Sequence, residues 1–394
     1  MTITPPPVRM GGGFDGYDPL ASLHGPDTAP AKDYRLRMAS PVTGPEEIDA
    51  VSSVISSGIL TNGPWTRRFE AAMAFRHGTR HAVAFANGTV ALAAMFTAVG
   101  IGPGDEVIVP SFTFIATATS VVHVGATPVF AEVDSLTFNL DPDDVARRIT
   151  PRTRAVVPVH YGGQPADLDR LLAVAEAHGI DLFEDAAQAH GALFQGRPAG
   201  SWGRAGMFSF TPVKAITTGE GAVVTTDDDD LAHQMRLLRN HGMSRPYHHE
   251  IVGYNWRLSE MQSAMGVRQL DRLDDILAVK AANAATMARL LADVDGVETP
   301  LELPDRTHPH TIYTLKVPAR RRDRVMDALD QAGIETRRYF PPAHLEPAFV
   351  SGNAHHLPVT EELAEQVVSI PFHSRITVAD LDEMTTIIRQ VITS

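Results

Sequence analysis

A lysine and a pair of carboxylates upstream of it are the residues of this chain best suited to carry chemistry. Lys214 follows an apolar, strand-like segment over residues 206–210, and no charged residue comes after it until Glu220. A lysine in a weakly hydrated pocket loses its proton more readily, because burial disfavours the ammonium form. The neutral amine can then form a Schiff base with a carbonyl group. Taken alone, such a lysine is more often a loop side chain whose charged head reaches water.

The carboxylates are Glu184 and Asp185, which end an apolar segment that begins at Ile180. Ligands of α/β proteins bind beyond the carboxyl ends of strands, so this is a position for binding residues. A carboxylate there can keep the ring nitrogen of pyridoxal phosphate protonated, and a lysine Schiff base with such an acidic partner is typical of enzymes that use this cofactor. Asp185 alone could instead cap the following helix. Its combination with Lys214 favours the cofactor.

A third segment, residues 81–92, has the pattern of a phosphate site. A strand-like run from His81 leads into Asn87-Gly88-Thr89 and then into an apolar helix start. Backbone amides at a helix N-terminus bind phosphate, because they lack partners within the helix and the helix dipole favours negative charge. Asn-Gly-Thr is also a common turn, so this segment supports the cofactor only together with the other two.

With these segments in order, the chain resembles the DegT/DnrJ/EryC1/StrS family of sugar aminotransferases, within the fold-type I pyridoxal phosphate enzymes. The resemblance runs from about Ser40 to the C-terminus. Besides the Lys214 loop, its motifs cover residues 58–64, 87–92, 102–114, 125–130, 149–154, 158–162, 184–188, 240–242, 253–259 and 269–273. Asn87 departs from the pattern, since many relatives have serine there, and so does Ala222, where a further glycine is usual. Relatives with histidine in place of Lys214 run deoxygenation, so the lysine favours transamination.

The resemblance implies a role for each residue that would surround the cofactor ring. Lys214 would form the Schiff base and shuttle the proton between the cofactor and the substrate carbon. Asp185 would pair with the pyridine nitrogen, and Gln188 would hydrogen-bond the ring hydroxyl. Phe114 would stack on the ring, where an aromatic side chain offers a flat apolar surface. His344 falls in a segment that lies near the substrate in relatives.

The same resemblance implies that Gly88, Thr89 and Ser209 hold the phosphate. Asn255 would reach that phosphate from the neighbouring subunit of a homodimer with shared active sites, and Arg257 would lie near the entrance, where the carboxylate of an amino donor could meet it. Each of these residues also has an ordinary structural alternative. Ser209 could bond its own backbone, for example, and Asn255 could be a turn residue.

The pattern of segments predicts an α/β fold, because apolar strands alternate with amphipathic helices. The resemblance implies a fold-type I architecture, with a large domain built on a mainly parallel seven-stranded sheet and a smaller C-terminal α/β domain. We expect a flexible, Pro- and Gly-rich extension over residues 1–38, a large cofactor-binding domain over 39–280 and the small domain over 281–394. Strands are expected over residues 107–110, 127–130, 155–159, 181–183, 207–210, 222–225 and 311–317. Helices are expected over residues 45–57, 167–178, 259–290 and 321–332, and from 378.

Composition limits the partners of this chain. Its 47 acidic and 34 basic residues give a net charge of −13, which argues against a nucleic-acid partner because binding a phosphate backbone needs a basic face. The absence of cysteine excludes disulfides and thiolate metal sites, and the run Asp227–Asp230 is expected to begin a helix rather than to bind a metal. Neither a membrane-spanning apolar run nor a leader pattern is visible, so we expect a cytoplasmic enzyme.

These inferences lead to a homodimeric, pyridoxal phosphate-dependent aminotransferase with ping-pong kinetics. Glutamate or glutamine would donate the amino group, and the acceptor would be a keto group of a sugar, linked to a nucleotide. The main alternative is a cyclitol ketone, and cationic or aromatic groups in the acceptor pocket would discriminate between the two. A cofactor-dependent dehydratase or lyase would need no amino donor. A DNA-binding regulator is disfavoured, because the first 38 residues are too short and too rich in Pro and Gly for a DNA-reading module.

Overall fold

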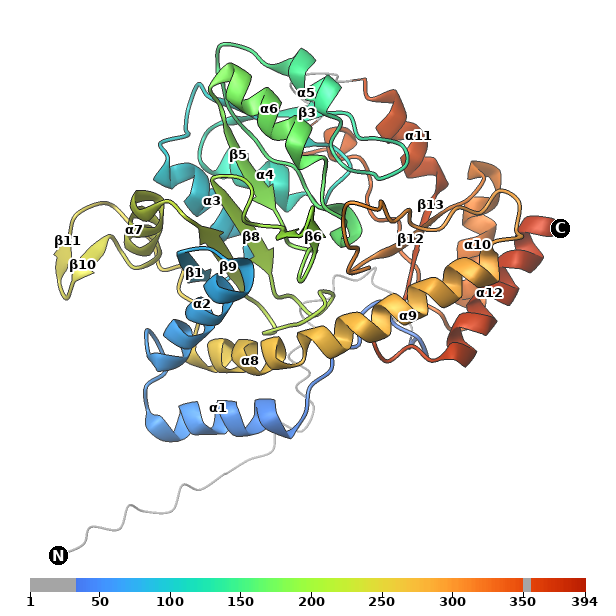
Figure 1. Cartoon of the computed structure of the whole chain (residues 1–394), viewed down its shortest axis with the longest axis horizontal. Coiled ribbons are helices and arrows are strands. Elements are labelled where there is room, and N and C mark those ends of the chain that lie inside the picture. Colours follow the sequence, from blue (N-terminus) through green and yellow to red (C-terminus); the bar gives the residue numbers. More distant parts are fainter. Residues whose placement is uncertain (1–32, 350–355) are drawn as a thin grey trace, which may run out of the picture. The chain divides into compact units, whose positions relative to one another are not determined.

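A seven-stranded sheet lies at the centre of the fold (Figure 1). The computed structural model describes residues 33–349 and 356–394, so residues 1–32 of the expected extension lie outside the described residues. The strands follow the order β1-β9-β8-β5-β4-β2-β3, and all neighbouring pairs are parallel except the two that include β9. This confirms the mainly parallel seven-stranded sheet. Its strands are His81–Phe85 (β1), Glu106–Pro110 (β2), Thr127–Ala131 (β3), Thr153–Val156 (β4), Asp181–Asp185 (β5), Ala205–Ser209 (β8) and Ala222–Thr226 (β9).

Helices cover both faces of the sheet: Pro64–His77 (α2), Gly88–Ala98 (α3), Ala116–His123 (α4), Pro142–Arg148 (α5), Leu168–His178 (α6) and Asp229–Arg239 (α7). Pro45–Ser57 (α1) precedes them and packs against a later helix, Glu260–Asp271 (α8). Alternate residues of one strand face different apolar clusters: Val107 and Val109 pack with residues of α3 and α4, and Ile108 packs with residues of α5 and α6. Asp228 accepts a hydrogen bond from Leu231 N at 2.9 Å, so the acidic run begins α7 as predicted.

The C-terminal part continues from the long helices Glu260–Asp271 (α8) and Leu273–Leu291 (α9). It contains the antiparallel pair Tyr313–Lys316 (β12) and Val367–Ile370 (β13), with the helices Ala319–Gln331 (α10), Pro358–Gln366 (α11) and Val378–Thr393 (α12). Helices α9, α10 and α12 share an apolar cluster with both strands. The predicted boundary between residues 280 and 281 falls inside α9, and the division into two domains stays a prediction. Shorter elements are Tyr161–Gly163 (η1), Leu193–Phe194 (β6), Arg197–Pro198 (β7), Met243–Arg245 (β10), His248–His249 (β11) and Ala343–Leu345 (η2).

The long helical stretch predicted over residues 259–290 is confirmed, and the structure divides it into α8 and α9, which meet at Arg272. The backbone there has φ −99° and ψ −8°, and the side-chain Nε donates to Glu47 Oε1 of α1 at 2.9 Å. This ion pair joins residues far apart in the sequence, so no local pattern indicates the break. Within the described ranges, no helix combines the length and apolar character that crossing a membrane requires.

Candidate active site

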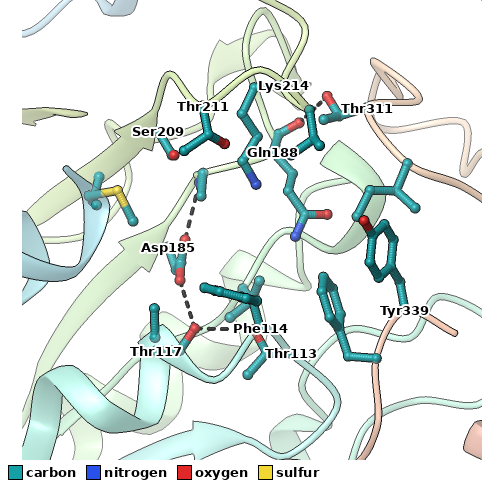
Figure 2. Close-up of a pocket in the computed structure, with 18 of the residues that line it drawn as sticks. Thr113, Phe114, Thr117, Asp185, Gln188, Ser209, Thr211, Lys214, Thr311 and Tyr339 are labelled. Atoms are coloured by element: carbon teal, nitrogen blue, oxygen red, sulfur yellow. Dashed lines mark hydrogen bonds between the residues drawn. The ribbon is translucent and has the colours of Figure 1, made fainter. Parts of the chain in front are cut away.

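A cavity of about 650 Å³ opens at the carboxyl ends of β1, β2, β5 and β8 (Figure 2). This is the edge at which α/β sheets bind ligands, because the segments that follow the strands converge there. Seven of the eight predicted site residues line the cavity: Gly88, Thr89, Phe114, Asp185, Gln188, Ser209 and Lys214. The eighth, Asn255, does not.

Lys214 lies in the loop that joins β8 to β9, and its side chain extends into the cavity (Figure 2). The loop is closed by the pairing of Ser209 with Ala222, and Lys214 N donates to Thr211 O at 3.0 Å. Burial lowers the pKa of Lys214 to about 8, although the carboxylate of Asp185 acts in the opposite direction. An appreciable fraction of the amine is therefore neutral near physiological pH, which is the form that attacks a carbonyl.

Asp185 presents its carboxylate to the cavity from the last position of β5, with only 4% of the residue exposed. Two donors hold the carboxylate: Thr117 Oγ1 donates to Oδ2 at 2.8 Å, and Ala187 N donates to Oδ1 at 3.1 Å. Burial raises the pKa of Asp185, while these hydrogen bonds and the charge of Lys214 oppose that rise. The result is an oriented acceptor for a protonated ring nitrogen.

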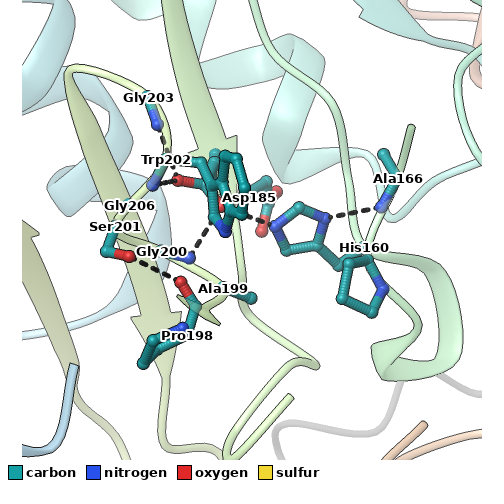
Figure 3. A network of polar contacts seen from close by, with 12 residues as sticks. His160, Ala166, Asp185, Pro198, Ala199, Gly200, Ser201, Trp202, Gly203 and Gly206 are labelled. Carbon is teal, nitrogen blue, oxygen red and sulfur yellow. Dashed lines mark hydrogen bonds and ion pairs between the residues drawn. The ribbon is translucent and has the colours of Figure 1, made fainter. Parts of the chain in front are cut away.

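The neighbouring carboxylate, Glu184, serves the structure instead, and Figure 3 labels the residues that donate to it: His160, Gly200, Trp202 and Gly203. It is fully buried and faces the other side of β5, because successive side chains of a strand alternate. His160 Nδ1 accepts from Ala166 N at 3.1 Å, so Nε2 carries the proton that His160 donates to Glu184 at 2.9 Å. Backbone amides also donate to Glu184, at 2.6–2.9 Å, from Gly200, Trp202 and Gly203. Burial raises the pKa of Glu184, but these donors outweigh it and lower the pKa overall.

The amide of Gln188 has a defined orientation. Gly162 N donates to its Oε1 at 2.8 Å, which leaves the Nε2 hydrogens as the donors that Gln188 can offer to the cavity. Thr311 Oγ1 donates to the backbone carbonyl of Gln188 at 2.6 Å. Gly163 allows the 161–163 turn to lie close to the backbone of Gln188, because its φ is +107° and a Cβ there would lie 2.6 Å from the carbonyl oxygen of Gln188.

The expected phosphate end is built on the N-terminus of α3. Asn87 Oδ1 accepts from Val90 N at 3.1 Å and so caps the helix. Gly88 and Thr89 occupy the first two helical positions, where amides have no acceptor within the helix, and both residues line the cavity beside Ser209. Asn87, the departure from the family pattern, therefore stabilises the helix end through its side chain and leaves anion binding to backbone amides.

An aromatic wall completes the cavity. Phe114 is 57% exposed, and its ring centroid lies 6.2 Å from that of Phe340. Tyr339 lies across the cavity from Asp185 (Figure 2). Sequence reasoning assigned no role to several lining residues, which come from six separate segments: Met38, Thr113, Thr117, Thr211, Thr311, Tyr339, Phe340 and Phe372. A signal existed for four of them, since Thr113 and Thr211 lie in family motifs and Tyr339 and Phe340 precede the His344 segment.

Three further residues of the sequence analysis stand away from the cavity of their own chain. Asn255 is exposed and forms a backbone bridge with Asn240, whose side chain accepts from Arg257 Nη1 at 2.7 Å. His344 is buried, and its Nδ1 lies 2.6 Å from Ser111 Oγ. It ties the 343–345 turn to the end of β2. A role for Asn255 at the phosphate would require a second copy of the chain and stays a prediction.

The donor set of the cavity fits pyridoxal phosphate. A lysine with a lowered pKa stands with a buried carboxylate, an amide that offers N–H groups, and a helix N-terminus with a hydroxyl beside it. These are the partners that the aldehyde, the ring nitrogen, the ring hydroxyl and the phosphate of the cofactor require. A carboxylate alone would fit many ligands, but the four groups on one cavity fit this one together.

Comparison with known proteins agrees with this fit. The model of the DegT/DnrJ/EryC1/StrS aminotransferase family matches residues 41–389. GDP-perosamine synthase of Caulobacter vibrioides is 40% identical over 365 residues, which cover 91% of this chain and 98% of that protein. The dTDP-3-amino-3,4,6-trideoxy-α-D-glucose transaminase of Streptomyces venezuelae is 42% identical over 327 residues, 82% of this chain and 86% of that one. The crystal structure of S. venezuelae DesV in complex with a ketimine intermediate has a TM-score of 0.85 at 40% identity, covering 89% of this chain and 95% of DesV.

Proposed function

The chain belongs to the DegT/DnrJ/EryC1/StrS aminotransferase family and is a pyridoxal phosphate-dependent sugar aminotransferase, and we propose that it transfers the amino group of glutamate or glutamine to a keto group of a nucleotide-linked sugar. The observation that carries the proposal is the joint presence of Lys214 and Asp185 on one cavity. Both similar transaminases are named for nucleotide-linked sugars, which supports this acceptor class.

Each residue of the cavity would have a separate role in the reaction. Bound pyridoxal phosphate supplies an electron-withdrawing ring that stabilises negative charge at the substrate carbon. Lys214, with its pKa lowered to about 8, would accept and return the proton at that carbon. Asp185 would hold a proton on the ring nitrogen, Gln188 Nε2 would donate to the ring oxygen, and the amides of Gly88 and Thr89 would bind the phosphate together with Ser209 Oγ.

One observation favours a second acceptor. Among the described residues, Lys214 is the one lysine or arginine that lines the cavity, so a single chain offers a diphosphate no further cation there. A cyclitol ketone carries no diphosphate and needs only the aromatic wall and hydrogen bonds. A nucleotide-linked acceptor would instead draw its cations from outside this cavity.

Within the same proposal, the chain forms a homodimer, and a second subunit supplies the groups that the cavity of one chain lacks. Val252 is 90% exposed and Tyr254 is 44% exposed beside Asn255, while Phe114 and Val213 leave apolar surface at the cavity itself. Exposed apolar side chains of this kind are typical of interfaces. Asn255 of one chain would then reach the phosphate in the other, and a cytoplasmic location follows for an enzyme supplied with nucleotide sugars.

The test is a visible absorption spectrum of the purified protein with bound cofactor, recorded before and after L-glutamate or L-glutamine is added. The cofactor band should fade with the donor, and Lys214→Ala should abolish this response. Adding GDP-, UDP- or dTDP-linked keto-hexoses should then restore the band, whereas restoration by a keto-cyclitol alone would establish the second acceptor. A band that no donor changes would refute transamination and point to lyase-type chemistry.

A further inference from the structure

Tyr161 joins the aromatic wall of the cavity to the turn that orients Gln188. It is the first residue of η1, is 4% exposed, and does not itself line the cavity. Its ring packs against Phe112 and Phe138, with ring centroids 5.3 Å away in each case. The proposed reaction assigns no role to this buried phenol, although its hydroxyl makes two hydrogen bonds across the fold.

The hydroxyl of Tyr161 belongs to a directed chain of hydrogen bonds. It donates to the backbone carbonyl of Tyr339 at 2.5 Å, and a carbonyl can only accept. The contact of 2.8 Å with Thr314 Oγ1 must therefore have the threonine as donor. Because the hydrogen of Thr314 is then used, Ser369 donates to Thr314 at 2.8 Å. The chain runs from β13 through β12 to the carbonyl of Tyr339, whose side chain lines the cavity.

Gly162, the residue after Tyr161, contacts a different part of the cavity, the side chain of Gln188. Gly162 N donates to Gln188 Oε1 at 2.8 Å, and Gly162 O accepts from Thr311 N at 2.7 Å. Two consecutive residues thus hold two parts of one cavity, the amide of Gln188 through a backbone N–H and the aromatic wall through a phenol. In the proposed reaction, the amide of Gln188 would face the cofactor, and the aromatic wall would face the sugar ring of the acceptor.

We propose that Tyr161 is a positioning residue that fixes the wall formed by Tyr339 and Phe340 and so determines how tightly the acceptor is held. This rests on the proposed function, in which the acceptor is a sugar ring. A sugar ring packs its C–H groups against aromatic faces, whereas glutamate and glutamine carry charged and amide groups that need polar partners. A displaced wall therefore weakens binding of the acceptor and leaves the reaction with the donor intact.

Tyr161→Phe tests this in the holoenzyme, because it keeps the packed ring and removes only the hydroxyl. Amide hydrogen exchange over residues 337–341 should become faster, with exchange over residues 185–188 unchanged. The KM for a GDP-, UDP- or dTDP-linked keto-hexose should rise roughly three- to tenfold, the factor that corresponds to one net hydrogen bond. The rate at which glutamate bleaches the cofactor band should stay within about twofold of wild type.

Thr314→Val is the matched control, since it removes a buried hydroxyl from the same chain and leaves the bond from Tyr161 to Tyr339 in place. It should change the acceptor KM less than Tyr161→Phe does. Equal effects of the two variants, or equal losses in the donor and acceptor reactions, would reduce Tyr161 to general stability. Unchanged exchange over residues 337–341 would overturn the positioning role. A wild-type enzyme that aminates no keto sugar would refute the proposed function instead, while the exchange measurement still decides whether Tyr161 holds the wall.

Discussion

Thr117 Oγ1 donates a hydrogen bond of 2.8 Å to Asp185 Oδ2, and Thr117 itself lies 3.1 Å from the hydroxyl of Thr113. All three side chains are buried. The carboxylate that would hold the ring proton is therefore oriented by the first turn of α4, a helix that follows a different strand. Because a hydroxyl that donates to a carboxylate favours its ionised form, Thr117 opposes the effect of burial on the pKa of Asp185.

Thr117→Val should impair both half-reactions while the shape of the site is kept. Loss of a hydrogen bond to a charged group costs roughly 1.5–3 kcal/mol, so we expect kcat to fall about tenfold or more. Stopped-flow measurement of the donor and acceptor steps checks this, and Thr117→Ser should recover most of the loss. If the serine variant is as slow as the valine variant, the hydroxyl has no such role.

Capture of the cofactor by the apoenzyme should depend on pH through Lys214. Only the neutral amine attacks the aldehyde, and its pKa is about 8. The rate at which the cofactor band appears should therefore fall roughly tenfold for each pH unit below 8 and level off above it. A rate that does not change across this range would contradict the assignment, and Lys214→Arg should give no Schiff-base band at any pH.

Asp185→Asn should abolish most activity without unfolding the protein. The carboxamide keeps the size of the side chain but removes the negative charge that stabilises a ring proton, and we expect kcat to fall roughly a hundredfold or more. Burial already disfavours the charge of Asp185, so the thermal midpoint should stay near that of wild type. Steady-state kinetics and thermal melting of the same preparation check both statements. Wild-type activity in this variant would refute the role of Asp185.

Glu184→Gln, one residue away, should instead destabilise the fold. Its carboxylate accepts from four donors, and a carboxamide would turn an NH₂ group toward some of them, at a cost of roughly 3–5 kcal/mol. The folded-state pKa of Glu184 lies below 4.5, so its stabilisation is complete above that pH and is lost as pH falls through the folded-state value. Urea unfolding should therefore show a gap between wild type and variant that narrows in acid. A gap that does not change with pH would argue against an ionised Glu184.

Lys280→Met should stabilise the protein at neutral and acid pH. Lys280 is 4% exposed and donates to Phe372 O at 2.7 Å, and burial lowers its pKa from 10.5 to about 7. The cost of burying this ammonium is fully present below pH 7 and is relieved as pH rises toward 10.5, where the unfolded chain also loses the proton. Urea unfolding should give the variant a free energy of unfolding that is larger than that of wild type by up to several kcal/mol at pH 7, and this difference should shrink as pH rises. A difference that grows with pH would mean that the fold stabilises the ammonium of Lys280 and raises its pKa above the unfolded-state value.

The sequence was sufficient to predict which residues of the local motifs lie at the cavity, but not the long-range contacts around them. Asp185 ends β5, and Gln188 and Lys214 lie in the segments that follow β5 and β8, while the sheet confirms the alternation of strands and helices. The bonds from Thr117 to Asp185 and from Tyr161 to Tyr339 join segments far apart in the chain. Periodicity shows which face of an element is buried, and it does not show which distant partner that face meets.

The same limit explains the two carboxylates at the end of β5. Adjacent positions of a strand point to opposite faces, so one of Glu184 and Asp185 had to leave the cavity. Glu184 is the one that points away from the cavity, where His160 and the amides of the loop over residues 200–203 donate hydrogen bonds to it. Neither is visible in the local pattern that located the pair.

The loop of Lys214 begins and ends at one strand pair, since Ser209 at the end of β8 lies opposite Ala222 at the start of β9. A segment tethered at both ends has little freedom to swing as a unit. The amine must therefore reach its successive partners by rotation about its own side-chain bonds rather than by movement of the loop. Substitutions that loosen the loop should accordingly bring no gain in the speed of turnover.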